Sequence, residues 1–196
     1  MDRQLGRDAI RDLLARYEPA SYDPEDPGRR AAVLMLLYER DGGIHILFQK
    51  RTETVQDHKG QVSLPGGSRD PEDESLVATA LRETFEEIGV QPVDIEVFGQ
   101  LDELRTSTNY RITPFVGWLN RYPYEWRFSD EEVAYLLEVP LSYLRNPGTF
   151  VPDRRTINGQ TYAFPSYQFG EDLIWGATAR MVANFLDICT AFEAGP

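Results

Sequence analysis

Three glutamates lie close together near the end of a predicted helix. Glu83, Glu86 and Glu87 are spaced i, i+3 and i+4, so their side chains are within reach of one another. Gly89 follows as the predicted C-cap, which places the carboxylates at the negative end of the helix dipole. Each acid is disfavoured there by about 0.3–1 kcal/mol. A divalent cation would neutralise the cluster, and oxygen ligands of this kind suit Mg²⁺ or Mn²⁺.

The alternative interpretation of the same three acids is a solvated acidic helix face, which is the commoner origin of a charge run. The opposite side of the predicted helix is apolar and is expected to pack on the core, since its residues recur at helical spacing: Val77, Ala80, Leu81, Thr84 and Ile88. The three glutamates are expected on the other side.

The segments around this helix predict a mixed sheet. Residues 31–38 form a continuous apolar run, as in a strand buried on both faces, and residues 44–49 form the returning strand after the Asp41-Gly42-Gly43 turn. Further strands are predicted at 95–101 and at 112–119, the second broken by Pro114. Asn158-Gly159 predicts a hairpin turn, and residues 174–192 lead into a closing helix. This order predicts an α/β (α+β) fold with a sheet between helices.

The chain of 196 residues is long enough for one domain with an addition. We expect an N-terminal helix over residues 3–17 and an extended connector, together residues 1–29, packed on a domain of residues 30–196. The aromatic-rich segment 123–129, together with Tyr122, is expected mainly in the core, with ring stacking on a ligand as the alternative. Residues 134–139 form an amphipathic stretch preceded by acids that would also suit a helix N-terminus.

Charge and cysteine content limit the partners. The net charge of −12 disfavours a nucleic-acid partner, although cations and a few arginines would still allow a phosphate-bearing small molecule. The one cysteine, Cys189, fits a reducing compartment. The first residues lack a basic and apolar leader, and no apolar run is long enough to span a bilayer, so we expect a cytoplasmic protein without membrane contact.

The string from Arg82 to Val90 resembles the second half of the Nudix box, and Pro65-Gly66-Gly67 resembles its opening. The resemblance implies a Nudix-type α-β-α sandwich and a hydrolase acting on phosphorus-containing anhydrides. The strings LFQKRT at 47–52, HKGQVSLPGG at 58–67 and IWGATAR at 174–180 also resemble the coenzyme A pyrophosphatase branch. Leu64 and Thr52 stand where that branch usually has Phe and Ser.

The resemblance implies a metal site and a catalytic set. Glu83, Glu86, Glu87 and the Gly67 carbonyl would hold Mg²⁺ or Mn²⁺. Arg82 lies four residues before Glu86 and would orient the cluster by ion pairing. The general base is Glu83 or one of the loop acids, Glu131 or Glu132, and the sequence does not choose between them.

The candidate substrate contacts are basic or polar residues near the box. Arg51 and Lys59 could meet the 3′-phosphate of coenzyme A, and His58 is either a substrate contact or a structural imidazole. Arg69 follows the box glycines, and Arg105 and Arg111 belong to a polar loop between strands, which is otherwise an ordinary solvated loop. The loop before the helix has one residue more than the general box, so either Asp73 or Glu74 occupies the first acid position.

The implied reaction is cleavage of coenzyme A or a derivative to 3′,5′-ADP and (acyl-)4′-phosphopantetheine by a monomer or homodimer. Three alternatives remain. The first is a Nudix hydrolase of another nucleotide, such as ADP-ribose, NADH or a nucleoside triphosphate. The second is an RNA-cap hydrolase, which the acidic composition disfavours. The third is a binding domain without catalysis, which the three retained glutamates disfavour.

Overall fold

The computed structural model describes residues 5–23, 25–53, 60–157 and 159–194, so the candidate contacts His58 and Lys59 lie outside the described residues. The helices and strands follow in the order α1 (Arg7–Leu14), β1 (Arg29–Arg40), β2 (Gly43–Arg51), β3 (Val62–Ser63), β4 (Gly66–Ser68), α2 (Leu76–Ile88), η1 (Pro92–Asp94), β5 (Ile95–Gln100), β6 (Leu104–Arg105), β7 (Tyr110–Leu119), β8 (Val133–Pro140), α3 (Leu141–Leu144), η2 (Pro147–Thr149), β9 (Asp153–Ile157), β10 (Gln160–Phe164), β11 (Tyr167–Phe169), β12 (Asp172–Ile174) and α4 (Gly176–Ala194).

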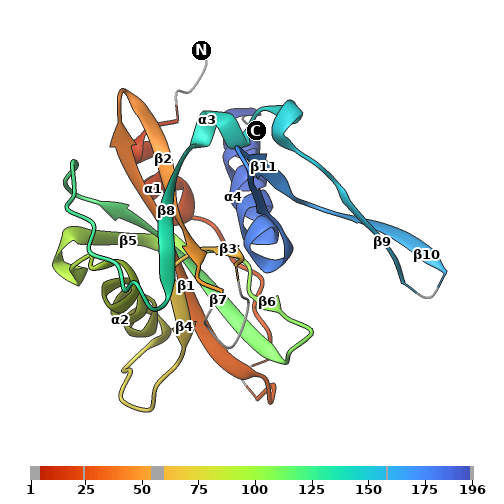
Figure 1. Cartoon of the computed structure of the whole chain (residues 1–196), viewed down its shortest axis with the longest axis horizontal. Helices are drawn as coiled ribbons and strands as arrows, with labels where there is room; N and C mark the ends of the chain where they lie inside the picture. Colours follow the sequence, from red (N-terminus) through yellow and green to blue (C-terminus); the bar gives the residue numbers. More distant parts are fainter. Residues whose placement is uncertain (1–4, 24, 54–59, 158, 195–196) are drawn as a thin grey trace.

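The long strand β1 lies in the middle of the molecule and is buried on both faces. Its odd-numbered residues from Val33 to Leu37 pack into one core with α1 and α4, and its even-numbered residues from Ala32 to Tyr38 pack into a second core with α2. Because successive side chains of a strand point to opposite faces, the two cores lie on opposite sides of the sheet. The predicted α-β-α sandwich with a mixed sheet is therefore confirmed (Figure 1).

The sheet forks beside β1. Its main order is β3-β2-β1-β7-β5, with β1 parallel to β7 and antiparallel to β2. The β1–β2 pairing covers the second half of β1, from Leu36 onward, whereas β4 pairs with residues 31–33. At the junction the Leu34 N–H donates to the Pro65 carbonyl at 2.8 Å. The glycine-rich start of the box is thus a short strand inserted where β2 turns away from β1.

Helix α1 packs on one face of the sheet. The helix is shorter than the predicted 3–17, and it buries Ile10 and Leu14 in the core shared with α4. The connector that follows is held by Arg111, whose guanidinium donates to the Tyr22 and Asp23 carbonyls. Among the described residues, none of the helices is long and apolar enough to cross a membrane.

Two predicted elements differ from the structure. Pro114 does not break β7. The partner of β7 on this side changes from β6 to β5 near Pro114, and the Pro114 carbonyl accepts from the Leu101 N–H between these two strands. The N–H that proline lacks would therefore point into the gap between β6 and β5, where no ladder hydrogen bond is lost. The stretch 134–139 is strand β8 paired with β2, so its acids do not begin a helix. The hairpin predicted at Gly159 is present as β9 and β10, which project from the body (Figure 1).

Candidate active site

Helix α2 carries the acids and has clear ends. The Ser75 hydroxyl accepts from the Ala78 N–H at 3.1 Å, and Gly89 closes the helix with a φ of 74°. A residue with a Cβ is strained at that φ, so the glycine fixes where the helix stops. Its last turn contains no basic residue. The predicted placement of the carboxylates at the negative end of the dipole is confirmed, and their charge is balanced by arginines that lie close in space.

Glu87 does not lie on the solvent side of α2 as expected. Its side chain is 3% exposed, and the helix buries it together with Thr84 and Ile88. One carboxylate oxygen accepts from Arg51 Nη1 at 3.1 Å and the other from the Gly66 N–H at 2.8 Å. At about 3.6 residues per turn, position 87 lies at the edge of the apolar face of α2. Strand β4, which takes the place of β2 beside β1, covers this edge and so buries Glu87.

Burial dominates the electrostatics of Glu87. It raises the pKa of this carboxyl to about 7, against the lowering effects of the Gly66 N–H, the Gln49 amide and the Arg51 charge. Glu83 adds a further raising effect as a like charge. Burial also raises the pKa of Glu83, although Arg82 opposes it. Raised carboxyl pKa values in one small region are typical of functional sites.

Arg82 binds the rest of the acidic cluster. Its Nη1 donates to Glu83 at 2.9 Å and to Glu86 at 3.0 Å, so the ion pair predicted from the i, i+4 spacing is present. Its Nε and Nη2 donate to the two carboxylate oxygens of Asp73, at 3.0 and 2.9 Å. The Ser68 carbonyl accepts from Nη2 at 3.1 Å. The guanidinium therefore connects the helix, β4 and the loop between them.

This network separates the roles of Asp73 and Glu74, which the sequence left open. Asp73 is 7% exposed, and the hydrogen bonds from Arg82 hold its pKa well below the usual range despite its burial. Glu74 is exposed. Asp73 is thus the anchor of Arg82. Arg69, whose Nη2 donates to the Asp73 carbonyl at 2.9 Å, supports the same loop.

The Glu83 carboxylate approaches Gly67 closely. A Cβ built on Gly67 would lie 2.5 Å from the Glu83 carboxyl carbon and 2.6 Å from both of its oxygens. The carboxylate therefore lies directly against the backbone of β4. The Gly67 carbonyl and the Glu83 carboxylate are two oxygen donors of the kind that Mg²⁺ and Mn²⁺ prefer.

The donor set fits a divalent cation, with one rearrangement. Among the described residues no group of three acidic, histidine or cysteine side chains converges as it would around a metal ion. The reason is visible in the ion pairs, since Glu87 is turned to Arg51 while Glu83 and Glu86 are turned to Arg82. A cation would replace the Arg51 contact of Glu87, whereas Glu83 and Glu86 each have one carboxylate oxygen that Arg82 does not bind.

The loop acids lie beside the same site. Both Glu131 and Glu132 are exposed. Their carbonyls accept from the Thr52 hydroxyl at 2.8 Å and from the Thr52 N–H at 2.9 Å. Because Thr52 directly follows Arg51, these bonds keep the loop next to the arginine that contacts Glu87.

Two of the predicted substrate contacts, Arg105 and Arg111, have protein partners in this structure. Arg111 is 3% exposed, and its nitrogens donate to Glu103 and to connector carbonyls, so it joins the connector to the sheet. Arg105 is half-exposed and pairs with Asp26 at 2.7 Å. The polar loop that suggested substrate contacts thus holds the N-terminal connector in place.

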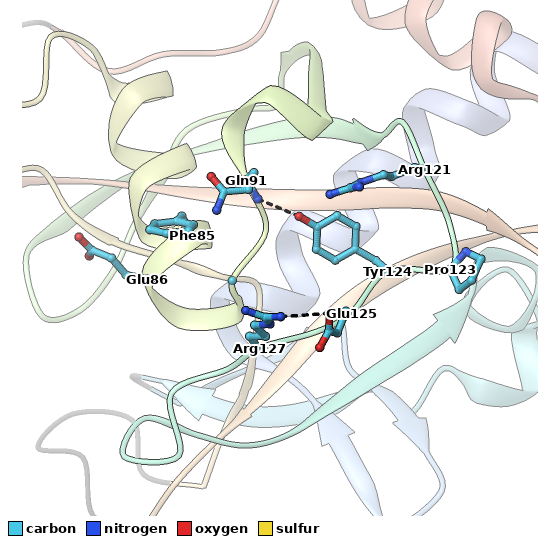
Figure 2. Close-up of a pocket in the computed structure, with 9 residues that line it drawn as sticks. Phe85, Glu86, Gln91, Arg121, Pro123, Tyr124, Glu125 and Arg127 are labelled. Atoms are coloured by element: carbon cyan, nitrogen blue, oxygen red, sulfur yellow. Dashed lines mark hydrogen bonds and ion pairs between the residues drawn. The ribbon is translucent and has the colours of Figure 1, made fainter.

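A pocket of about 670 Å³ opens beside Glu86, between the end of α2 and the segment 121–127 (Figure 2). Phe85 and Tyr124 line it, and Phe85 is 44% exposed. The Tyr124 hydroxyl donates to Asp94 at 2.8 Å and accepts from the Gln91 N–H at 3.1 Å, which fixes the ring. The other aromatic residues of the segment pack on the core, as expected.

Gln49 was missed by the sequence analysis. It is a fully buried amide in strand β2, two residues before the Arg51 that contacts Glu87, and neither of its polar atoms has a hydrogen-bond partner among the described residues. The available signal was one uncharged polar residue directly after the apolar residues 46–48.

Comparison with known proteins places the chain in a family. The model of the NUDIX domain matches residues 28–156. The chain is 36% identical over 178 residues to the "Uncharacterized Nudix hydrolase NudL" of Photorhabdus laumondii subsp. laumondii, covering 89% of this chain and 94% of that protein.

Two solved structures share the fold. A Nudix hydrolase from M. smegmatis, RenU, aligns with a TM-score of 0.56 at 18% identity, covering 86% of this chain and 88% of that one. A MutT/nudix family protein from Enterococcus faecalis aligns with a TM-score of 0.57 at 16% identity, covering 97% and 72%. The match of the NUDIX domain model over residues 28–156 and the 36% identity to the Photorhabdus laumondii protein show that the chain belongs to the Nudix hydrolase family.

Proposed function

We propose that this Nudix hydrolase is a divalent-metal-dependent diphosphatase of coenzyme A or its derivatives. The products would be 3′,5′-ADP and (acyl-)4′-phosphopantetheine. The observation that carries the proposal is the position of Arg51. This arginine belongs to the LFQKRT string that resembles the coenzyme A branch, and its guanidinium contacts Glu87 of the box helix. The branch-like residue is thus part of the site in which the anhydride would be cleaved.

A second support is the proximity of the three branch-like strings. Ile174 of the IWGATAR string and Val62 and Leu64 of the HKGQVSLPGG string are buried in the same core. Lys50, next to Arg51, pairs with Asp172 at 2.8 Å and so joins β2 to the strand before α4. Segments far apart in the sequence thus converge on one side of the box.

The chemistry follows from the donors present. Bound Mg²⁺ or Mn²⁺ would polarise phosphate oxygens and lower the pKa of a coordinated water. The groups that would hold it are Glu83, Glu86, Glu87 and the Gly67 carbonyl. Arg82 would keep Glu83 and Glu86 in position, as its hydrogen bonds do here. Arg51 would be left free for a substrate phosphate once Glu87 turns to the metal.

The proton acceptor is proposed among Glu83, Glu131 and Glu132. The loop acids are exposed beside Arg51, so they can reach a water in the open part of the site. Glu83→Gln, Glu131→Gln and Glu132→Gln separate the candidates. Loss of the base lowers kcat with little change in Mn²⁺ affinity, whereas loss of a metal ligand lowers both kcat and the affinity for Mn²⁺.

The pocket beside Glu86 offers room for one end of the substrate. It contains the exposed ring of Phe85, the fixed ring of Tyr124 and the guanidinium groups of Arg121 and Arg127 (Figure 2). Aromatic faces and arginines suit a planar ring and a phosphate. We expect Phe85→Ala to raise KM, while Leu173→Ala, which removes an equally exposed apolar side chain elsewhere, leaves KM unchanged.

The decisive experiment is a substrate panel with Mg²⁺ and with Mn²⁺. It compares coenzyme A with dephospho-coenzyme A, ADP-ribose, NADH and 8-oxo-dGTP. We expect the highest kcat/KM for coenzyme A or an acyl derivative. Arg51→Met should reduce the preference over dephospho-coenzyme A, with Arg105→Gln as the control arginine.

One result would overturn the proposal, and a second would overturn the role of the 3′-phosphate in it. A higher kcat/KM for ADP-ribose or NADH would assign the enzyme to a different Nudix substrate class. Equal rates on coenzyme A and dephospho-coenzyme A would remove the 3′-phosphate role from Arg51 and from Lys59.

A further inference from the structure

Buried polar atoms without partners gather beside the acid cluster. In the described part of the chain, six such side-chain atoms are found, and three belong to two facing residues: Gln49 Nε2, Gln49 Oε1 and Ser63 Oγ. Gln49 is 0% exposed. A buried polar group without a hydrogen bond costs about 1–3 kcal/mol, so an unpaired amide here indicates a function for it.

The two residues are directly opposite each other in the β2–β3 ladder. Opposite residues of an antiparallel pair have their Cβ atoms about 5 Å apart on the same face of the sheet. Arg51 lies two residues further along β2, on that same face, and its guanidinium contacts Glu87. Gln49 and Ser63 therefore lie on the side of the sheet that faces the box helix.

The three unpaired atoms complement one another and Glu87. A serine hydroxyl can donate to an amide oxygen, and the amide nitrogen can then donate to a carboxylate. Gln49 lies on the same face of β2 as Arg51, whose guanidinium already bonds to Glu87, so the amide is on the side of the sheet where that carboxylate lies. The expected chain of hydrogen bonds runs from the Ser63 hydroxyl to the Gln49 amide and from this amide to the Glu87 carboxylate.

A neutral donor has an advantage over Arg51 at this position. A carboxylate that binds a divalent cation is poorly compatible with a guanidinium on the same oxygen, because the two cations repel. An amide carries no charge, so its N–H can stay bonded to a carboxylate that also binds the cation. Groups of this kind orient metal ligands, and their loss typically costs 10–100-fold in metal affinity.

We propose that Gln49, supported by Ser63, is a positioning residue that holds the Glu87 carboxylate when Glu87 leaves Arg51 for a divalent cation. The proposal rests on the metal dependence of the proposed function, and it is independent of the substrate. Arg51 and Gln49 thus serve two states of the same carboxylate: Arg51 binds it in the absence of the cation, and Gln49 in its presence.

The test is a Mn²⁺ titration without substrate, with free Mn²⁺ followed by electron paramagnetic resonance. The variants are Gln49→Met, which keeps the shape of the side chain, Ser63→Ala and the double variant. The matched control is Thr149→Val, which removes a buried hydroxyl that donates to the Asn146 and Tyr143 carbonyls far from the site. Thermal melting establishes that each variant is folded.

We expect Gln49→Met to weaken Mn²⁺ binding about 10-fold and Ser63→Ala to weaken it about 3-fold. The double variant should match Gln49→Met, because Ser63 acts through Gln49. Thr149→Val should bind Mn²⁺ as the wild type does.

Unchanged Mn²⁺ affinity in folded Gln49→Met would overturn the proposal and leave Gln49 as a structural amide solvated by buried water. Additive losses in the double variant would overturn the role of Ser63. Should Gln49→Met fail to fold, Ser63→Ala decides alone, since wild-type affinity in that variant contradicts the proposal. Failure on coenzyme A in the substrate panel leaves this binding result unaffected.

Discussion

Glu87 and Glu103 are both buried glutamates paired with an arginine, yet their electrostatics are opposite. Glu87 is 3% exposed and Glu103 8%. Burial taken alone raises the pKa of both carboxyl groups. At Glu103 the hydrogen bonds from Thr113, the Tyr22 N–H and Arg111 outweigh burial, and the pKa ends below its ordinary value. At Glu87 burial wins, and the pKa rises to about 7.

The difference lies in how fully each carboxylate is bonded. Glu103 accepts from Arg111 Nε and Nη2 at 3.1 and 3.0 Å, from Thr113 at 2.7 Å and from the Tyr22 N–H at 2.8 Å. In the described part of the chain, Glu87 accepts a hydrogen bond from Arg51 on one oxygen and from the Gly66 N–H on the other. A carboxylate that is bonded on all sides stabilises the fold, whereas one that is buried and under-bonded is available for a ligand.

The largest effect is expected on turnover. Glu87→Gln removes a charged oxygen ligand and should lower kcat/KM about 10³-fold, equivalent to about 4 kcal/mol, because the metal supplies several kcal/mol of charge stabilisation. Glu86→Gln should act in the same direction. Both variants should fold, as judged by circular dichroism. Retained Mg²⁺-dependent activity in both would contradict the assigned metal site.

Replacing Glu103 should lower the stability of the fold and leave turnover chemistry intact. Glu103→Gln leaves Arg111 buried at 3% exposure without its counter-charge, and we expect a loss of about 3–5 kcal/mol in the free energy of unfolding. Urea denaturation measures it. Mn²⁺ affinity of the folded variant should match that of the wild type. A stability loss below 1 kcal/mol would mean that Glu103 and Glu87 do not differ as described.

The two carboxylates should also give opposite pH slopes. The folded-state pKa of Glu87 lies above its ordinary value of 4.5, so between pH 4.5 and about 7 the folded protein binds a proton that the unfolded chain releases. Stability from this group therefore falls as pH rises through that window, by about 3 kcal/mol. The lowered pKa of Glu103 has the reverse sign, and its contribution is lost as the pH falls below the ordinary value.

Urea denaturation in the presence of a chelator tests these slopes. Relative to wild type, Glu87→Gln should gain stability between pH 5 and pH 7, because it removes the group that becomes less favourable there. A constant difference between Glu87→Gln and wild type across that range would show that Glu87 titrates normally.

The smallest effect is expected at Arg105, whose ion pair with Asp26 is half-exposed. Arg105→Gln should change the free energy of unfolding by less than about 1 kcal/mol. It should leave kcat and KM unchanged, because its partners belong to the connector. A raised KM would restore Arg105 to the substrate contacts predicted from the loop sequence.

The sequence predicts the framework of the site better than its side-chain partners. The apolar run of β1, the turn at Gly42 and the C-cap at Gly89 are local signals, so the hairpin and box helix follow directly. The i, i+4 pair of Arg82 and Glu86 is also local.

The remaining contacts depend on tertiary structure. Arg51 and Glu87 are 36 positions apart, and Arg111 meets the connector carbonyls 88 and 89 positions away. Nothing in the spacing of a single sequence encodes such pairs. The burial of Glu87 depends on the fork in the sheet, which arises when β2 leaves β1 and β4 takes its place.

The two adjacent box glycines should respond differently to a saturation mutagenesis screen. At Gly66, with φ at +147°, a Cβ would lie 2.3 Å from the Ala32 carbonyl oxygen and 2.5 Å from the Val33 Cα, both rigid backbone. At Gly67 the obstructing atoms are the end of the flexible Glu83 side chain. Substitutions at Gly66 should therefore deplete the pool of folded protein, while those at Gly67 should preserve abundance and lose only metal binding. Neighbouring positions in one motif would then report separately on folding and on function.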